Sequence, residues 1–181
     1  DGGFAAVEQE ELHRLVRRYT ERYVEQELHN FQNRNARFRY LFARLRTTAY
    51  AVIDQVAAEL RCSDFVPMAF ELSFGGKNGA LSAVTISEPD GELRVGGKVD
   101  RVDGWLHDGR LYLRVVDYKS GRKSFDLANV RMGLDIQMLL YLFTLQKEGA
   151  RYFGQEIEPA GVLYLPARDE ILSLERNVTP E

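Results

Sequence analysis

The first third of the chain carries apolar residues at the spacing of α-helices. Leucine, valine and aromatic residues recur every three or four positions over residues 12–28 and again over residues 38–60. Residues 29–35, between them, include three asparagines, a residue type that disfavours helix interiors and favours turns. The pattern therefore predicts two amphipathic helices, which we expect to form an antiparallel hairpin.

Beyond residue 64 the apolar positions alternate with polar ones, as they do in strands. Turns are expected at the glycine-rich residues 75–79 and at residues 89–91, Pro-Asp-Gly. The predicted strands cover residues 69–74, 81–86, 92–102 and 111–116. Because these strands follow one another through short turns, we expect an antiparallel meander.

The last third returns to helical spacing over residues 134–147, and Gly149 follows as a suitable C-cap. Residues 162–165 and 171–174 predict two more strands, the first of them parallel to strand 111–116 across the helix. The expected fold is α/β (α+β), with one mixed β-sheet flanked by helices. We expect one structural domain, in which residues 1–64 form a helical segment that packs on a core of residues 65–181.

Composition agrees with one soluble globular domain. The chain has 181 residues, 45% of them hydrophobic, and a net charge of −3. Its apolar runs are far shorter than the roughly 20 residues that span a bilayer. A single cysteine, Cys62, excludes an internal disulfide and favours a reducing compartment, for which the bacterial cytoplasm is the default. Because the chain begins Asp1-Gly-Gly, we expect a piece of a longer protein.

Three short motifs carry the candidate chemistry: Gly97-Lys-Val-Asp100, Val115-Val-Asp-Tyr-Lys119 and Gln137-Met-Leu-Leu-Tyr141. Asp117 and Lys119 lie two positions apart at the end of an apolar strand, so their side chains lie on the same face of the strand and that of Tyr118 on the opposite face. If Asp100 reaches the same end of the sheet, the two carboxylates repel each other unless a divalent cation lies between them. Two carboxylates, water and a backbone carbonyl, here that of Tyr118, suit Mg²⁺ or Mn²⁺.

Such a set of groups is suited to hydrolysis of a phosphodiester. A metal ion lowers the pKa of a bound water, and a nearby lysine orients that water and stabilises developing charge. The chain has no Gly-x-Ser-x-Gly motif of a serine hydrolase and no P-loop, so ATP hydrolysis by these residues is not expected.

The ordered motifs resemble the PD-(D/E)XK nuclease superfamily in its RecB-like branch. Residues 69–75, 100–103 and 117–121 are most similar to the nuclease domain of bacterial ATP-dependent helicase/deoxyribonucleases of the AddB (RexB) type. The resemblance implies a restriction-endonuclease-like core. It also implies that Asp100 and Asp117 are metal ligands, that Lys119 is the catalytic lysine, and that Gln137 and Tyr141 face the site and bind DNA.

The resemblance further implies that Glu71 or Asp103 supports the site. Pattern alone favours plainer roles, a solvated carboxylate for Glu71 and the start of a turn for Asp103. Proteins of the AddB type also carry four cysteines for a [4Fe–4S] cluster, so we expect that cluster in the full-length protein and not in this chain, which has only Cys62. No histidine here matches the additional metal ligand of the family.

Charge is unevenly distributed along the chain. Residues 94–131 hold nine basic and five acidic residues, a local balance of +4 that is typical of a groove for phosphates. The leading hypothesis is a Mg²⁺- or Mn²⁺-dependent exodeoxyribonuclease domain of a recombinational-repair helicase–nuclease. It would act on single-stranded DNA ends delivered by a helicase, beside an AddA-like partner. One alternative is a catalytically idle module of the same fold that binds DNA or a partner, and another is a small-molecule binding module.

Overall fold

The computed structural model describes residues 6–28, 35–76, 79–121, 126–134 and 136–167. They fall into two compact units. The first contains the described residues up to Ala58 together with Pro166 and Ala167, and the second runs from Glu59 to Leu165. Within the described segments, no helix combines the length and the apolar character needed to cross a membrane.

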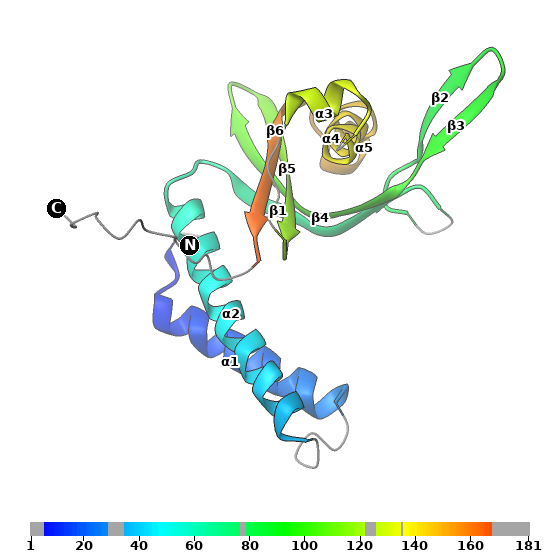
Figure 1. Ribbon diagram of the computed structural model, residues 1–181. Coiled ribbons are helices and arrows are strands. Elements are labelled where there is room, and N and C mark those ends of the chain that lie inside the picture. The colour runs from blue at the N-terminus through cyan, green and yellow to red at the C-terminus, as the bar shows by residue number, and fades with distance from the viewer. Residues whose placement is uncertain (1–5, 29–34, 77–78, 122–125, 135, 168–181) are drawn as a thin grey trace, which may run out of the picture. The chain divides into compact units, whose positions relative to one another are not determined.

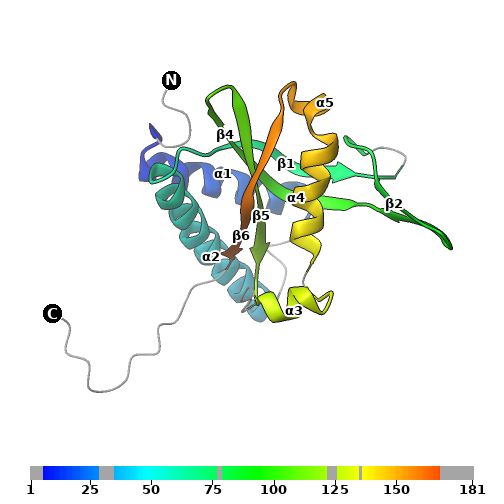
Figure 2. The ribbon, with the colours of Figure 1, turned by 90° about the horizontal axis from the view of Figure 1, so that it is seen from above.

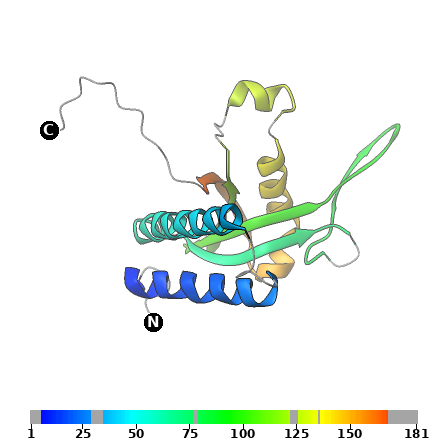
Figure 3. The same ribbon diagram turned by 60° about the horizontal axis from the view of Figure 1, so that its bottom comes forward.

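The first unit is a pair of helices, α1 (Gln9–Gln26) and most of α2 (Ala36–Arg61), which lie side by side in Figure 3. The side-chain oxygen of Asn35 accepts a hydrogen bond from the N–H of Phe38 over 2.8 Å and so caps the start of α2. His13 of α1 lies 2.8 Å from Asp54 near the other end of α2. The start of one helix thus meets the end of the other, which confirms the predicted antiparallel hairpin.

The second unit is built on a four-stranded sheet with the order β1-β4-β5-β6. Strand β4 pairs antiparallel with both β1 and β5, and β5 and β6 point in the same direction in Figure 1. Near the starts of β5 and β6, the N–H of Leu111 donates to the carbonyl of Glu156 over 3.1 Å. The four strands are β1 (Val66–Phe74), β4 (Gly97–His107), β5 (Arg110–Lys119) and β6 (Ile157–Pro166). The sheet is mixed, so the predicted α/β (α+β) class is confirmed.

Three helices connect β5 to β6: α3 (Leu127–Arg131), α4 (Gln137–Glu148) and α5 (Ala150–Phe153). The predicted helix is therefore present as α4, which lies along the sheet in Figure 2, and Gly149 is its C-cap. Apolar side chains of α4 and of the strands form one buried core, which includes Leu72, Phe74, Val99, Val102, Leu113, Val115, Met138, Leu142 and Leu145. This core gives the site a rigid base.

The predicted meander is wrong in its pairing. Strands β2 (Val84–Glu88) and β3 (Gly91–Val95) form a separate two-stranded sheet that extends from the start of β4 in Figure 1, while β1 pairs with β4. The segment predicted as one strand over residues 92–102 divides at Gly96. An alternation of apolar and polar residues predicts a strand but not the strand with which it pairs. Most residues of β3 are exposed, because the core of the four-stranded sheet is formed without them. The strand predicted over residues 171–174 lies outside the described residues.

Candidate active site

Asp100 lies where the regular alternation of β4 is interrupted. Val99 and Val102 both belong to the buried core, although residues an odd number of positions apart face opposite sides of a regular strand. The side-chain direction therefore shifts by one position at Asp100 and Arg101. In the paired strand β1, Glu71 has a left-handed backbone with φ of 52°, and the register with β4 shifts between Pro67 and Ala69.

The carboxylate of Asp100 is oriented by the backbone of the neighbouring strand. The N–H of Tyr118 in β5 donates a hydrogen bond to Oδ2 of Asp100 over 3.0 Å. The β4–β5 ladder pairs Arg101 with Val116, so Asp100 reaches the level at which β5 carries its last charged residues. The structure thus brings the first and second motifs to one end of the sheet.

Asp117 and Lys119 form an ion pair at this end. Nζ of Lys119 lies 2.7 Å from Oδ2 of Asp117, and the side chains of the lysine and the aspartate are 35% and 15% exposed. Pairing with the Asp117 carboxylate raises the pKa of Lys119, although partial burial opposes this, and the more distant charge of Asp100 adds to the rise. The lysine is therefore cationic at neutral pH.

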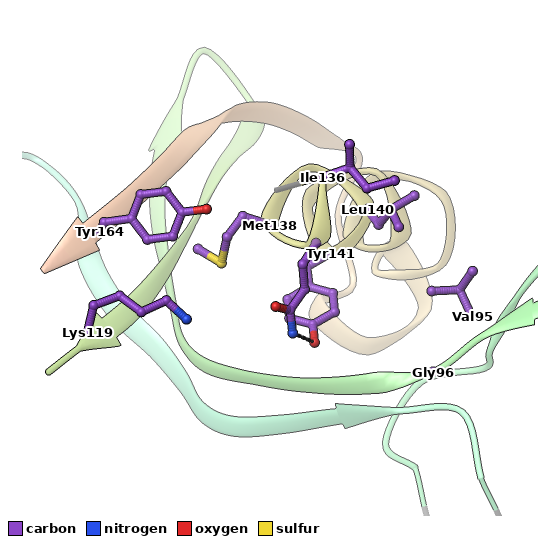
Figure 4. A pocket seen from close by; sticks show the side chains of 9 residues that line it. Val95, Gly96, Lys119, Ile136, Met138, Leu140, Tyr141 and Tyr164 are labelled. Carbon is purple, nitrogen blue, oxygen red and sulfur yellow. Dashed lines mark hydrogen bonds between the residues drawn. The ribbon is translucent and has the colours of Figure 1, made fainter. Parts of the chain in front are cut away.

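A cavity of about 390 Å³ joins this lysine to the third motif. In Figure 4 the side chains of Lys119 and Tyr141 point toward the same space from β5 and α4. Nε2 of Gln137 donates a hydrogen bond to the hydroxyl of Tyr141 over 2.5 Å, as the i, i+4 spacing on a helix allows. The cavity is lined by Val95, Gly96, Lys119, Ile136, Gln137, Met138, Leu140, Tyr141 and Tyr164.

Tyr164 of β6 is a lining residue that the sequence analysis missed. It enters the cavity because β6 lies beside β5, and its ring is turned toward Met138 in Figure 4. The parallel placement expected for strand 162–165 was the one signal that pointed to it. A strand parallel to β5 brings its own last residues to the end at which β5 carries Lys119.

Asp103 does not begin a turn, so that prediction is wrong. It lies inside β4 with its side chain 0% exposed, and Oδ2 accepts hydrogen bonds from Nη2 of Arg101 over 2.9 Å and from Nε of Arg114 over 3.0 Å. Arg114 lies an odd number of positions before Asp117 in β5, so it is on the face of that strand away from the cavity. The burial of Asp103 was not predicted, because charged residues at alternating positions are also typical of a strand with one face exposed to solvent.

Glu71 is an exposed carboxylate. Its side chain is 62% exposed and forms an ion pair with Lys98, whose pKa it raises. The structure does not bring Glu71 to the cavity that Lys119 lines.

The basic balance of residues 94–131 overstates the charge available to a ligand. Arg101 is 1% exposed, Arg114 pairs with Glu59 and Asp103, and Arg110 pairs with Glu158 over 2.6 Å. The expectation of a phosphate groove along the whole segment is therefore too broad, because these three arginines are paired with carboxylates of the fold, as are Arg94, Lys98 and Lys119. Residues 122 and 123 lie outside the described part.

The residues present fit a divalent metal ion. The carboxylate of Asp117 is mostly buried, and Nζ of Lys119 lies 2.7 Å from its Oδ2. A mostly buried carboxylate, with a second carboxylate on the adjacent strand, is a set of oxygen ligands that suits Mg²⁺ or Mn²⁺. In the described segments no three histidine, cysteine, aspartate or glutamate side chains are grouped as metal ligands would be. Among the described residues, Asp100 and Asp117 are the candidate ligands.

Comparison with known proteins agrees with this arrangement. The family model of the PD-(D/E)XK nuclease superfamily matches residues 4–180. The chain belongs to this superfamily. The resemblance stated from the three motifs is therefore confirmed, and the fold is that of a PD-(D/E)XK nuclease.

Curated relatives of this superfamily member are named as the B-type subunit of ATP-dependent helicase/deoxyribonucleases. The protein of Clostridium tetani is 32% identical over 150 residues, 82% of this chain. That of Ruminiclostridium cellulolyticum is 36% identical over 146 residues, or 80%, and that of Lysinibacillus sphaericus is 33% identical over 172 residues, or 94%. The matched stretches make up 13%, 13% and 15% of these relatives, so the chain is similar to one part of each of them.

Proposed function

We propose that this chain is a metal-dependent deoxyribonuclease domain that hydrolyses phosphodiester bonds in DNA. The observation that carries the proposal is that Lys119, which is paired with Asp117, lines one cavity together with the hydrogen-bonded Gln137 and Tyr141. Membership of a nuclease superfamily supports the same reaction class.

The carboxylates of Asp100 and Asp117 would hold Mg²⁺ or Mn²⁺, with the backbone carbonyl of Tyr118 as a further ligand. A bound ion of this kind lowers the pKa of a water and neutralises charge on the scissile phosphate. Asp100 contributes a carboxylate that the Tyr118 amide has already oriented. Asp117 contributes one that is mostly buried and that is paired with the Lys119 ammonium.

Lys119 supplies positive charge at the cavity wall. Because the raised pKa keeps Nζ protonated, the lysine donates hydrogen bonds to the attacking water and to the phosphate oxygens, and does not act as the base. Its ion pair with Asp117 holds Nζ within reach of both. Catalysis then draws on charge already in position rather than on a covalent nucleophile.

Gln137 and Tyr141 would bind the DNA strand. The Gln137 amide has a carbonyl and a second N–H beyond the hydrogen bond to Tyr141, and both groups can pair with phosphate or base edges. Met138, Ile136 and Leu140 add an apolar wall against which a base or sugar can pack.

The names of the relatives indicate the setting. We infer that the domain acts as an exonuclease in recombinational repair in the bacterial cytoplasm, on single-stranded ends delivered by a helicase and beside an AddA-like partner. A [4Fe–4S] cluster would belong to the full-length protein, since Cys62 is the one cysteine of this chain and is exposed.

Titration of the chain with Mn²⁺ by calorimetry, together with cleavage of end-labelled single-stranded DNA, tests the proposal. We expect Asp117→Ala to abolish both, and Asp90→Ala, which removes an exposed turn carboxylate, to retain both. Unchanged Mn²⁺ affinity in Asp117→Ala contradicts the ligand assignment. DNA binding without any cleavage by the wild type indicates the catalytically idle module instead.

A further inference from the structure

A cluster of charged side chains is buried on the face of β4 and β5 away from the cavity. Arg101 and Asp103 are 1% and 0% exposed, and Nε of Arg101 lies 2.8 Å from Oδ1 of Asp103. Glu59 accepts from Arg101 over 3.3 Å and from Arg114 over 2.5 Å. Arg114 also donates to Asp103. Two cations and two anions are thus paired in a closed set.

This closed set is rigid because its charges are paired where water has little access. Removing one member of a buried pair leaves an uncompensated charge, which is strongly unfavourable. Each arginine contacts both carboxylates, so neither guanidinium can turn without losing two partners. The cluster therefore offers a fixed point of attachment to a neighbouring group.

That neighbouring group is the side chain of Tyr118. Its hydroxyl accepts a hydrogen bond from Nη1 of Arg101 over 2.9 Å, and the guanidinium carbon lies 5.8 Å from the centre of its ring. The backbone N–H of the same tyrosine donates a hydrogen bond to the side chain of Asp100, also in β4, over 3.0 Å. One residue thus connects the buried cluster to a carboxylate of the site.

The connection matters because Tyr118 is the penultimate residue of β5. Strand ends open locally more readily than strand centres. The β4–β5 ladder ends at Val116 opposite Arg101, so beyond this point β5 is linked to β4 through side chains, while β6 lies along its other edge. The bond from Tyr118 to Arg101 supplies such a contact two residues beyond the ladder.

We propose that Tyr118 is a positioning residue, which the Arg101 cluster anchors through its hydroxyl and which in turn orients the Asp100 carboxylate through its amide. The role of this orientation in holding a metal ion rests on the proposed function, whereas the mechanical link does not. Tyr118 itself need touch neither DNA nor the reacting atoms through its side chain, which lies on the opposite face.

The test compares Tyr118→Phe with Tyr112→Phe in the 181-residue chain. Both tyrosines lie on the same face of β5, but the ring of Tyr112 packs against Trp105, with centroids 5.4 Å apart, rather than on Arg101. Hydrogen exchange of the residue 118 amide, followed by NMR without metal, measures how firmly this amide is held. The Mn²⁺ affinity, measured by calorimetry, shows whether the position of Asp100 affects metal binding.

We expect Tyr118→Phe to speed exchange of the residue 118 amide by about fivefold or more, as loss of one hydrogen bond allows, while the amides of Leu113 and Val115 keep wild-type rates. Mn²⁺ affinity should fall by a similar factor. Tyr112→Phe should change neither quantity. A general rise in exchange along β5 would indicate lost stability rather than lost positioning, and would overturn the inference.

Equal exchange at residue 118 in Tyr118→Phe and wild type also overturns it. Failure of the proposed function is a separate result, because in that case the wild-type chain binds no Mn²⁺. In that case the exchange measurement still decides whether the cluster holds Asp100 through Tyr118.

Discussion

The hydroxyl of Tyr141 lies where Gly97 leaves room for it. A Cβ atom on Gly97 would be 2.7 Å from the Tyr141 hydroxyl oxygen and 2.9 Å from Cε1 of the same ring. The ring is held from another side by Phe74, edge to face at a centroid distance of 4.9 Å. The glycine of the first motif thus has a specific role in seating the tyrosine of the third.

We expect Gly97→Ala to destabilise the chain by about 1–3 kcal/mol, the usual cost of overpacking a filled core. Urea unfolding measures the change. Gly91→Ala, where a Cβ atom meets nothing within 4 Å, is the control and should be close to neutral. Tyr141→Phe in the Gly97→Ala background should restore part of the loss, because the closest clash involves the hydroxyl. Equal stability of Gly97→Ala and Gly91→Ala would show that the ring moves without cost.

The second prediction concerns Lys119. Lys119→Ala should lower the rate of DNA cleavage by about a hundredfold or more, the loss typical of removing one preorganised charged or donor group. Mn²⁺ and DNA binding should persist, since the substitution leaves both aspartates in place. Steady-state cleavage and calorimetry measure the two effects, with Lys147→Ala in the last turn of α4 as the control. Cleavage at the wild-type rate would make Lys119 a structural residue.

The third prediction contrasts two arginines. Arg101→Ala removes one cation from the buried cluster and should cost about 3–5 kcal/mol of unfolding free energy. Arg110→Ala breaks an exposed ion pair with Glu158 and should cost about 0–1 kcal/mol. Urea denaturation of both variants measures the difference. Similar losses in the two would mean that burial does not govern the strength of these pairs.

The fourth prediction concerns the metal ion and salt. With two carboxylates from the chain, the other ligand positions fall to water, a backbone carbonyl and DNA phosphate, an arrangement that should favour Mn²⁺ over Mg²⁺ because Mg²⁺ demands near-ideal octahedral geometry. Cleavage of single-stranded DNA by this chain should therefore be weak, stronger with Mn²⁺, and absent with a chelator.

Activity should also fall steeply as salt increases, because counterions compete for the phosphates. Initial rates across a series of salt concentrations and with each metal measure both effects. Cleavage that survives the chelator would contradict the metal mechanism, and robust digestion with Mg²⁺ would contradict the expected preference.

Local pattern in the sequence was sufficient for most elements of the fold. Periodicity located the two long helices, the strand that ends at Lys119 and the helix that carries Gln137 and Tyr141, since each of these buries one regular stripe or face. The three motifs were also recognisable from residue type and spacing, because Asp117 and Lys119 must share a face of any strand they occupy. The superfamily could therefore be named before the fold was known.

Only the tertiary structure decided which segments meet. Strand β1 pairs with β4 rather than with the next strand in the chain, because partner choice depends on how the faces of the whole sheet are buried. The same distant packing turns Asp103 inward to Arg101 and Arg114, shifts the alternation of β4 at Asp100, and brings Tyr164 beside Lys119. The sequence by itself determined the chemical groups and their local order, whereas their meeting depends on contacts between residues far apart in the chain, which no local pattern specifies.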